Sequence, residues 1–293
     1  MVAFADIVSV GRCWLKGISQ IMLLENAFSG LLLLIGVFYG SPLMGLAMTL
    51  AVICGTSAAT ILKFNQSEID KGLYGFSAAL VGAGLLLFFE PTAVAWILVV
   101  ICSIMASLLQ HFFIRRNIPA FTFPFVLIMW IVIFIATRYF PFLLSSTTYS
   151  DSLNIDYLGF GIKSFGQVIF QDSMVAGMLF FIAVLIDSPM GALFGLAAAM
   201  LSGFISWLIF APIGEVSMGL FGYNAVLCAI VFAGKNISDV VWAVISVLMA
   251  LVIGWFMWNY RLVQLTFPFV LASCITVIVK GYMVTSHGKS SSM

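Results

Sequence analysis

Charged side chains are scarce in this chain of 293 residues, where they make up only 8%. Ordinary globular domains carry about 25%. A chain with so little charge cannot cover its own surface in water, which excludes a soluble globular protein. Hydrophobic residues make up 63%, and the mean hydropathy is +1.20. The sequence therefore predicts a polytopic integral membrane protein.

Basic residues are too few for electrostatic binding to a polyanion. Twelve Lys and Arg against eleven Asp and Glu leave a formal net charge of +1. Such a balance offers no basic face for nucleic acid and no polybasic tract for anionic lipid. No nucleic-acid partner is therefore expected.

The residues that usually carry chemistry are isolated. The five cysteines stand singly, and His111 and His287 lie far apart. Neither set has metal-ligand spacing, so no metal and no cofactor is expected. No phosphate-binding glycine loop is present, so ATP coupling is not built into the chain. An intramembrane enzyme or a structural subunit, the rival class, would need clustered His, Asp and Ser side chains or a cofactor ligand set, which the sequence lacks.

Apolar residues occur in runs long enough to cross a bilayer, for which a helix needs about 20 residues. The runs are continuously apolar rather than alternating, which favours helices over strands. Two runs are short and two others are interrupted at 122–124 and 266–268, so half-membrane or re-entrant helices are expected among them. Ten spans are predicted, at 20–39, 42–62, 73–89, 93–114, 122–140, 167–186, 189–210, 219–234, 238–259 and 266–284.

The segments outside these runs have simpler assignments. Residues 1–19 carry Arg12 and Lys16 and no cleavage site, which predicts an N-terminal interfacial helix rather than a removable signal peptide. The polar interval 141–166 predicts an extramembrane linker, and residues 285–293 predict a C-terminal tail.

An internal repeat is the most informative feature of the chain. Gln20 matches Gln167 at an offset of 147 residues (167 − 20), and Glu68 matches Glu215 at the same offset. The segment GLYGFSA at 72–78 also falls on GLFGYNA at 219–225. Such a register, held across about 60 residues, is difficult to obtain by chance.

The offset then changes to 144 (266 − 122). There the six residues TFPFVL at 122–127 recur unchanged at 266–271. The sequence therefore predicts two membrane repeats, 20–140 and 167–284.

Five spans per repeat is an odd number, so the second repeat must enter the membrane from the opposite side. Inverted repeats of this kind place a permeation pathway at their interface, centred near the midplane. Ten spans put both termini on one side, where Arg12, Lys16, Lys280 and Lys289 lie. The positive-inside rule then predicts cytoplasmic termini.

The two TFPF motifs contain candidate pore residues. Pro124 and Pro268 lack an N–H, so neither can bond the carbonyl four residues earlier. In a membrane a bare carbonyl is tolerated only where protein or a wet cavity satisfies it. With the hydroxyls of Thr122 and Thr266, the motifs predict two patches of acceptors near mid-membrane. An ordinary proline kink is the alternative, and the occurrence of the motif in both repeats favours pore lining.

The paired acids and amides are further candidates. An intramembrane carboxylate is a functional-site hypothesis by default, which applies to Glu68 and Glu215. The alternative places both at the headgroup level, where each occupies the first turn of a helix. Gln20 and Gln167 open the first span of each repeat, and their amides suit a neutral polar solute. The alternative is an ordinary interfacial glutamine.

Apolar and acidic residues near the two glutamines complete the set. Leu23 and Phe170 follow three residues later, on the same predicted helix face, and would supply apolar walls. Glu25 and Asp172 are also paired, with a vestibule or a helix-capping role.

These groups suit a small, planar, neutral molecule rich in N–H donors. A bare ion would need charge rings or a carbonyl cage, and neither signature is present. Intramembrane acids are too few to indicate proton or sodium coupling. The sequence therefore favours passive, channel-like passage in which no residue is consumed, so the chain is not expected to be an enzyme.

The segments that contain the two TFPF motifs resemble a known family signature. Residues 118–125 (IPAFTFPF) resemble the LPxxTxPF signature of the urea transporter family, and 262–269 (LVQLTFPF) resemble its second copy. The departures are Ile118 in place of Leu and Val263 in place of Pro. The glycine-rich segments resemble those that follow the family's pore glutamates, and the similarity extends over nearly the whole chain.

The resemblance implies an all-α fold of two inverted five-helix repeats with half-membrane pore helices. It also implies a homotrimer in the lipid bilayer, in which each subunit has its own channel for facilitated diffusion of urea. The chain is similar to compact bacterial members, which implies the bacterial inner membrane. The pore residues it implies are Thr122 and Thr266 at a narrow centre, Gln20, Glu68, Gln167 and Glu215 at the outer sites, and Leu23 and Phe170 as apolar walls.

Another small neutral solute, such as ammonia or a short amide, is the alternative permeant. An ammonia pore would be expected to have paired luminal histidines. His111 and His287 differ by 176 residues (287 − 111), which is neither repeat offset. That spacing favours urea over ammonia.

Overall fold

The computed structural model describes residues 2–145, 159–209 and 212–290. The first half, up to residue 145, contains α1 (Val2–Ser19), η1 (Gln20–Met22), α2 (Ala27–Gly40), α3 (Pro42–Ile61), α4 (Gln66–Asp70), α5 (Phe76–Phe88), α6 (Ala93–Arg115), α7 (Phe123–Tyr139) and η2 (Pro141–Leu143). The second half, from residue 159, contains α8 (Phe160–Gln167), α9 (Met174–Asp187), α10 (Pro189–Leu208), α11 (Ile213–Ser217), α12 (Tyr223–Phe232), α13 (Ile237–Asn259) and α14 (Phe267–Ser290). Apart from one isolated bridge between Phe89 and Leu144, the regular structure of these residues is helical.

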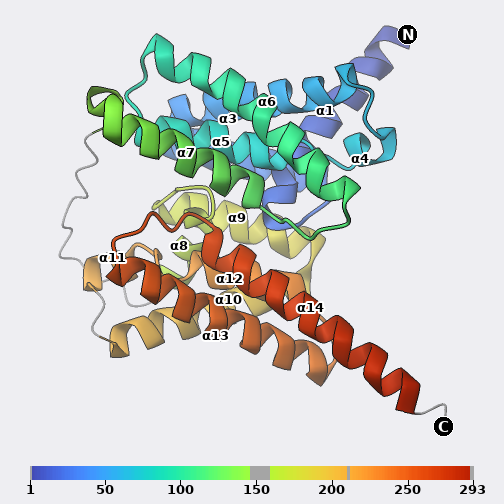
Figure 1. Cartoon of the computed structure of the whole chain (residues 1–293), viewed down its shortest axis with the longest axis vertical. Helices are drawn as coiled ribbons and strands as arrows, with labels where there is room; N and C mark the ends of the chain where they lie inside the picture. Colours follow the sequence, from blue (N-terminus) through green and yellow to red (C-terminus); the bar gives the residue numbers. More distant parts are fainter. Residues whose placement is uncertain (1, 146–158, 210–211, 291–293) are drawn as a thin grey trace.

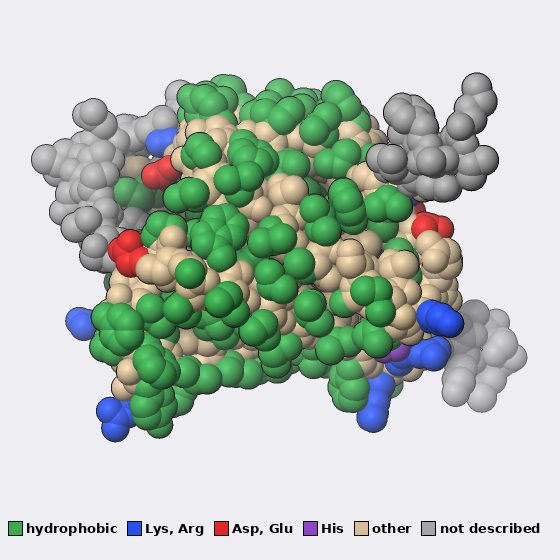
Figure 2. Space-filling view, turned by 90° about the horizontal axis from the view of Figure 1, so that it is seen from above, with side chains coloured by type: hydrophobic (Ala, Val, Ile, Leu, Met, Phe, Trp, Pro, Cys, Tyr) green, Lys and Arg blue, Asp and Glu red, His purple; other side chains and the backbone are tan. Residues whose placement is uncertain are grey.

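Several of these helices are suited to cross a membrane. Four are long and apolar enough, namely α3, α6, α10 and α13, and α1 with α2 forms a fifth candidate that is bent by 75°. Shorter apolar helices accompany them in both halves. Figure 2 shows a broad apolar surface on the first half, with charged side chains gathered toward two opposite edges. The chain is therefore a polytopic membrane protein.

The two halves repeat each other in the order and length of their helices. α2 and α9 have 14 residues each, α3 and α10 have 20, α4 and α11 have 5, and α6 and α13 have 23. α5 and α12, with 13 and 10 residues, differ in length but are both buried along almost their whole length. At 1.5 Å per residue they are only about 20 and 15 Å long, shorter than the roughly 30 Å hydrocarbon core.

The strained backbone positions are paired as well. Leu23 and Phe170 have φ of 62° and 59°, and Phe121 and Leu265 have φ of 45° and 46°. A residue other than glycine stays in this region only where its surroundings enforce it, at a cost of about 1–3 kcal/mol. The backbone therefore adopts the same left-handed conformation at equivalent positions of the two halves.

The halves lie one above the other and meet along α2 and α9 (Figure 1). The Ser29 hydroxyl of α2 donates to the Ala183 carbonyl of α9 over 2.8 Å. Both α1 and α14 extend toward the same side, where the two ends of the chain are marked in Figure 1.

A second contact zone joins the halves at α7 and α14. The Trp130 indole N–H donates to the Val263 carbonyl over 2.8 Å, and the Cys274 thiol donates to the Pro119 carbonyl over 2.8 Å. Both donors and both acceptors are related by the 144-residue offset (274 − 130 and 263 − 119). α7 is thus bonded to the turn that precedes α14, and α14 is bonded to the turn that precedes α7.

Two predicted spans were wrong at their starts. The spans 20–39 and 167–186 are each broken, because Leu23 and Phe170 turn the chain before Asn26 and Ser173 cap α2 and α9. The Asn26 side chain accepts from the N–H of Phe28, so the new helix starts with a satisfied donor. A lead-in helix therefore precedes the first span of each half.

The predicted linker and the predicted C-terminal tail can each be compared with the structure in part. Most of the interval assigned to a linker, residues 146–158, lies outside the described residues. α14 continues to Ser290, within the interval 285–293 that the sequence assigned to a tail.

Candidate functional site

The hydroxyls of Thr122 and Thr266 meet between the two halves. Their Oγ1 atoms lie 2.6 Å apart, and the two residues are only 3% and 2% exposed. Thr122 precedes α7 and Thr266 precedes α14, so the two helices begin at this point. The repeated motif has thus brought two equivalent oxygens together at the interface.

The prolines of this motif do not act as the sequence predicted. Pro124 lies in the first turn of α7, where a missing N–H costs nothing, so no helix is kinked there. The carbonyls predicted to be bare are bonded, because Ala120 accepts from the Phe123 N–H over 2.8 Å and Gln264 from the Phe267 N–H over 3.1 Å. Pro124 and Pro268 therefore lie at helix starts. The prediction that these prolines leave the carbonyls of Ala120 and Gln264 without a hydrogen bond was wrong.

The turn before Thr266 is held by α12. The Leu265 carbonyl accepts from the Tyr223 hydroxyl over 2.6 Å and from the Asn224 amide over 3.3 Å. The Asn224 amide oxygen in turn accepts from the Phe269 N–H over 3.1 Å. These bonds fix the strained residue that precedes the second threonine.

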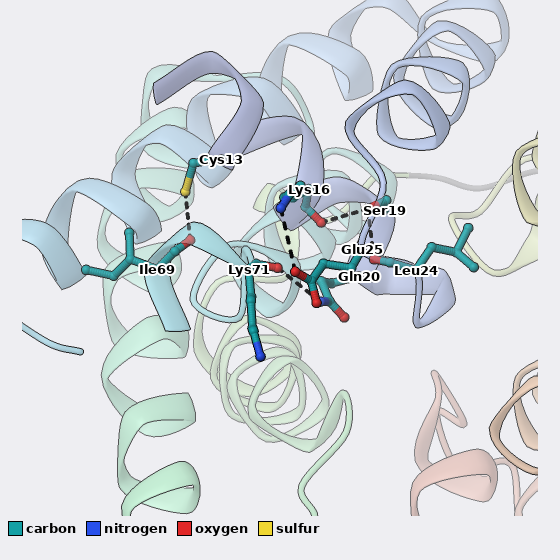
Figure 3. Close-up of polar contacts among 8 residues, drawn as sticks. All are labelled: Cys13, Lys16, Ser19, Gln20, Leu24, Glu25, Ile69 and Lys71. Atoms are coloured by element: carbon teal, nitrogen blue, oxygen red, sulfur yellow. Dashed lines mark hydrogen bonds and ion pairs between the residues drawn. The ribbon is translucent and has the colours of Figure 1, made fainter. Parts of the chain in front are cut away.

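Gln20 in the first half and Gln167 in the second make equivalent contacts. The Gln20 side-chain amide donates to the Lys71 carbonyl over 3.0 Å (Figure 3), and the Gln167 amide donates to the Met218 carbonyl over 3.1 Å. Both acceptors belong to the glycine-rich turn after the short helix, and they are related by the same 147-residue offset (218 − 71). Each glutamine ends its lead-in region rather than opening a span, which corrects the predicted position.

The acids and the apolar residues near the glutamines differ between the halves. Glu25 pairs with Lys16 over 3.6 Å (Figure 3), whereas Asp172 faces a cavity. Leu23 and Phe170 are both partly buried and pack against the core, and Phe170 also lines the same cavity as Asp172. Both lie in the left-handed turn and not on a continuous helix face, so that part of the prediction was wrong.

The cavity has a volume of about 440 Å³ and is lined mainly by residues of the second half, with Leu87 and Phe88 from the first. It combines amide, carboxylate and hydroxyl groups with apolar and aromatic walls, which suits a small polar molecule with flat faces. Its lining residues are Leu87, Phe88, Gln167, Phe170, Asp172, Met218, Leu220, Tyr223, Val263, Gln264 and Leu265.

Glu68 and Glu215 lie in the first turns of α4 and α11, and both are partly exposed. This is the first-turn position that the alternative interpretation predicted, at which a carboxylate is favoured by the helix dipole. Neither residue lines the cavity described above.

Glu68 has a polar environment that is specific to the first half. It accepts a hydrogen bond from the Tyr74 hydroxyl, and the same hydroxyl lies 3.0 Å from Nδ1 of His111. The His111 ring stacks on Phe64 with centroids 3.6 Å apart.

The second half replaces this network with apolar contacts. The position equivalent to Tyr74 is Phe221 (74 + 147), whose ring packs against Trp258 with centroids 6.2 Å apart. The two glutamates therefore share a helical position but not a set of partners.

A Tyr74→Phe variant is expected to fold and to be destabilised by about 1–2 kcal/mol, because Glu68 and His111 each lose a hydrogen-bond partner. The ring itself should fit, since Phe already occupies the equivalent position 221. The thermal unfolding midpoint in detergent measures the effect, with Tyr260→Phe at an exposed position as the control. Equal midpoints for the two variants would contradict a stabilising role for the network.

The sequence reasoning missed several polar residues of the site. Tyr223, Asn224 and the side chain of Gln264 were not predicted from the sequence as polar residues of the site. The signal available was their position, because all three lie within or beside the repeated segments. Among the described residues, no cluster of three or more His, Cys, Asp or Glu side chains could hold a metal.

Comparison with known proteins identifies the family of the chain. The chain matches the family model described as "Urea transporter" over residues 12–281. It is 27% identical over 237 residues to Urea transporter 1 of Rattus norvegicus and of Capra hircus, and 26% identical to that of Mus musculus. Each alignment covers 75% of this chain and 62% of the relative, so the chain spans about three fifths of the length of these relatives. Since the family model covers nearly the whole sequence, the chain belongs to the urea transporter family.

Proposed function

We propose that this protein allows passive, facilitated diffusion of urea through a pathway between its two halves. The observation that carries the proposal is the meeting of Thr122 and Thr266 across the interface, 2.6 Å apart, in a member of the urea transporter family. The relatives named Urea transporter 1 add support for the permeant.

The pathway we propose runs from one glutamine to the other through the threonine pair. Gln20 with Glu68 serves one mouth, and Gln167 with Glu215 serves the other. Leu23 and Phe170 supply apolar walls beside the amides. Urea has four N–H donors and one carbonyl oxygen, so amide, carboxylate and hydroxyl groups can replace its hydration bonds in sequence.

The physical basis of selectivity is desolvation. Moving a polar group from water into an apolar medium without a hydrogen bond costs about 2–7 kcal/mol. A planar neutral molecule can exchange water for side-chain oxygens step by step, whereas an ion must give up a much larger hydration energy. The binding sites must remain weak, because a deep free-energy minimum would trap the solute.

The topology we propose has ten crossings in two inverted repeats, 20–140 and 167–284. The crossings are α2, α3, α5, α6 and α7, followed by α9, α10, α12, α13 and α14, with the short helices α5 and α12 spanning only part of the membrane. The matched helix lengths and the common side of the two chain ends support this arrangement. We also propose cytoplasmic termini, a homotrimer and a bacterial inner membrane, on the resemblance to compact bacterial members of the family.

The proposal is tested by stopped-flow urea uptake into proteoliposomes that contain the purified protein, beside protein-free vesicles. Urea flux well above that of bare lipid, saturating at high urea concentration, is expected. The same vesicles tested with acetamide and ammonia separate urea from the alternative solutes. Flux no faster than bare lipid, with the protein monodisperse and folded, would refute urea transport. Native mass spectrometry of the detergent-solubilised protein tests the trimer independently.

A further inference from the structure

The two halves differ in where they carry a buried or cavity-facing amide. Gln264 of the second half corresponds to Ala120 of the first (264 − 144), and Gln110 of the first half corresponds to Gly254 of the second (110 + 144). Each half therefore has one amide and one small residue at these two positions, but the assignment is exchanged. The glutamine side chain therefore has a different environment in each half.

In the first half the amide is used for packing. Gln110 is only 7% exposed, and its oxygen accepts from the Ser77 hydroxyl over 3.5 Å. It lies on α6 beside α5 and takes no part in lining a described cavity. Gln110 thus supports the packing of two helices.

In the second half the amide faces the cavity. Gln264 is partly exposed and lines the 440 Å³ cavity together with Gln167, Asp172 and Tyr223. Its Nε2 donates to the Gly254 carbonyl over 3.0 Å, which holds the amide against α13. Among the described residues, the amide oxygen of Gln264 has no hydrogen-bond donor.

Position along the chain places this amide between the mouth and the centre. Gln264 lies two residues before Thr266, and it shares the cavity with Gln167. An amide held by its own N–H has a fixed orientation, which lowers the entropy lost when a ligand binds to it.

We propose that Gln264 is an additional urea-binding residue, which accepts an N–H of urea as the solute passes between Gln167 and Thr266. The second-half mouth then binds urea more tightly than the first-half mouth, where Ala120 occupies the equivalent position. This inference depends on the proposed urea pathway and adds a residue and an asymmetry to it.

The test is Gln264→Leu, which keeps the size of the side chain and removes its polar atoms. Loss of one hydrogen bond is expected to raise the urea concentration that gives half-maximal flux by about three- to tenfold. Urea flux should also fall more than acetamide flux, because acetamide has only one amino group. Both are measured by stopped-flow in proteoliposomes.

The matched control is Gln66→Leu, the same chemical change at an exposed position whose repeat equivalent is Ile213 (66 + 147). An unchanged half-saturating concentration in Gln264→Leu, with wild-type urea flux intact, would overturn the inference and leave the proposed function standing. An equal loss of urea and acetamide flux with a lowered thermal midpoint would indicate a structural role instead and would also overturn it. Wild-type proteoliposomes that take up urea no faster than protein-free vesicles would refute the proposed function itself.

Discussion

Replacing both Thr122 and Thr266 by valine is expected to lower urea flux by about 100-fold, since each lost hydroxyl costs about 1–3 kcal/mol of hydrogen bonding at a buried site. Valine has nearly the shape of threonine, so the width of the pathway should not change. What changes is the polarity of the point where the repeated motifs of the two halves touch through their hydroxyls. The measurement is stopped-flow urea uptake into proteoliposomes at equal protein content.

Each single variant is expected to show most of this effect. In each one, the remaining hydroxyl loses its partner at 2.6 Å and becomes a buried polar group with one neighbour fewer. Because an unsatisfied buried hydroxyl adds its own cost, we expect each single variant to lose about 30-fold in flux, so that the roughly 100-fold loss in the double variant is smaller than the product of the two single losses. Two residues in direct contact rarely act independently.

The matched control is Thr137→Val, an exposed threonine on the same helix as the motif. It should leave urea flux at the wild-type level. A folded Thr122→Val/Thr266→Val protein that keeps more than half of the wild-type flux would show that these hydroxyls do not serve the pathway.

Hydropathy was sufficient to locate the long helices. The predicted spans 42–62, 93–114 and 238–259 correspond to α3, α6 and α13 within one residue at either end. These helices have unbroken apolar sequences and begin at Ser41, Thr92 and Asn236, which are good N-capping residues. Length, composition and capping all specify the same helix there.

Hydropathy could not locate the breaks at Leu23 and Phe170. Both residues are apolar and lie within apolar sequence, so their left-handed backbone has no compositional signal. Their conformation is imposed by tertiary packing of the lead-in helix against the glycine-rich turn. The one local sign was the capping residue that follows each break, Asn26 or Ser173.

The candidate site was predicted only where the repeat was symmetric. The pairing of Gln20 with Gln167 and of Thr122 with Thr266 could be read from the offsets, because identical residues recur there. The difference between Gln110 and Gln264 could not be read in this way, because the glutamine lies on a helix in the first half and in a turn in the second. It is seen only in the structure, where Gln110 packs against α5 and the Gln264 amide donates to the Gly254 carbonyl.

The glycine-rich turns leave no room for a side chain at their left-handed positions. Gly72 and Gly219 have φ of +78° and +81°, a region that costs about 1–3 kcal/mol for a residue with a Cβ. A Cβ at Gly219 would lie 2.5 Å from the Ser164 nitrogen, and one at Gly72 would collide with the Gly17 nitrogen. Backbone is the obstacle in both cases, so no side-chain movement can relieve the clash.

Gly72→Ala is therefore expected to destabilise the protein by at least about 3 kcal/mol, and Gly219→Ala by a similar amount. At 2–4 °C per kcal/mol this corresponds to a fall of roughly 10 °C in the thermal midpoint. Fluorescence-detected size-exclusion chromatography after heating measures it.

These turns also carry the acceptors of the site. Lys71 and Met218, which receive the amides of Gln20 and Gln167, each directly precede one of the two glycines. Any variant protein that survives should therefore lose urea flux as well as stability, because the strained turn moves the carbonyl that orients the glutamine.

The controls lie on neighbouring short or lead-in helices. A Cβ at Gly11 in α1 or at Gly214 in α11 would meet no neighbouring atom within 4 Å, so Ala at either should be neutral or stabilise the helix by up to about 1 kcal/mol. If Gly72→Ala and Gly219→Ala behaved like these two controls, the turns would not be fixed as described. The glutamines would then need another explanation for their matched bonds, because a turn that tolerates a Cβ can place its carbonyl in more than one direction.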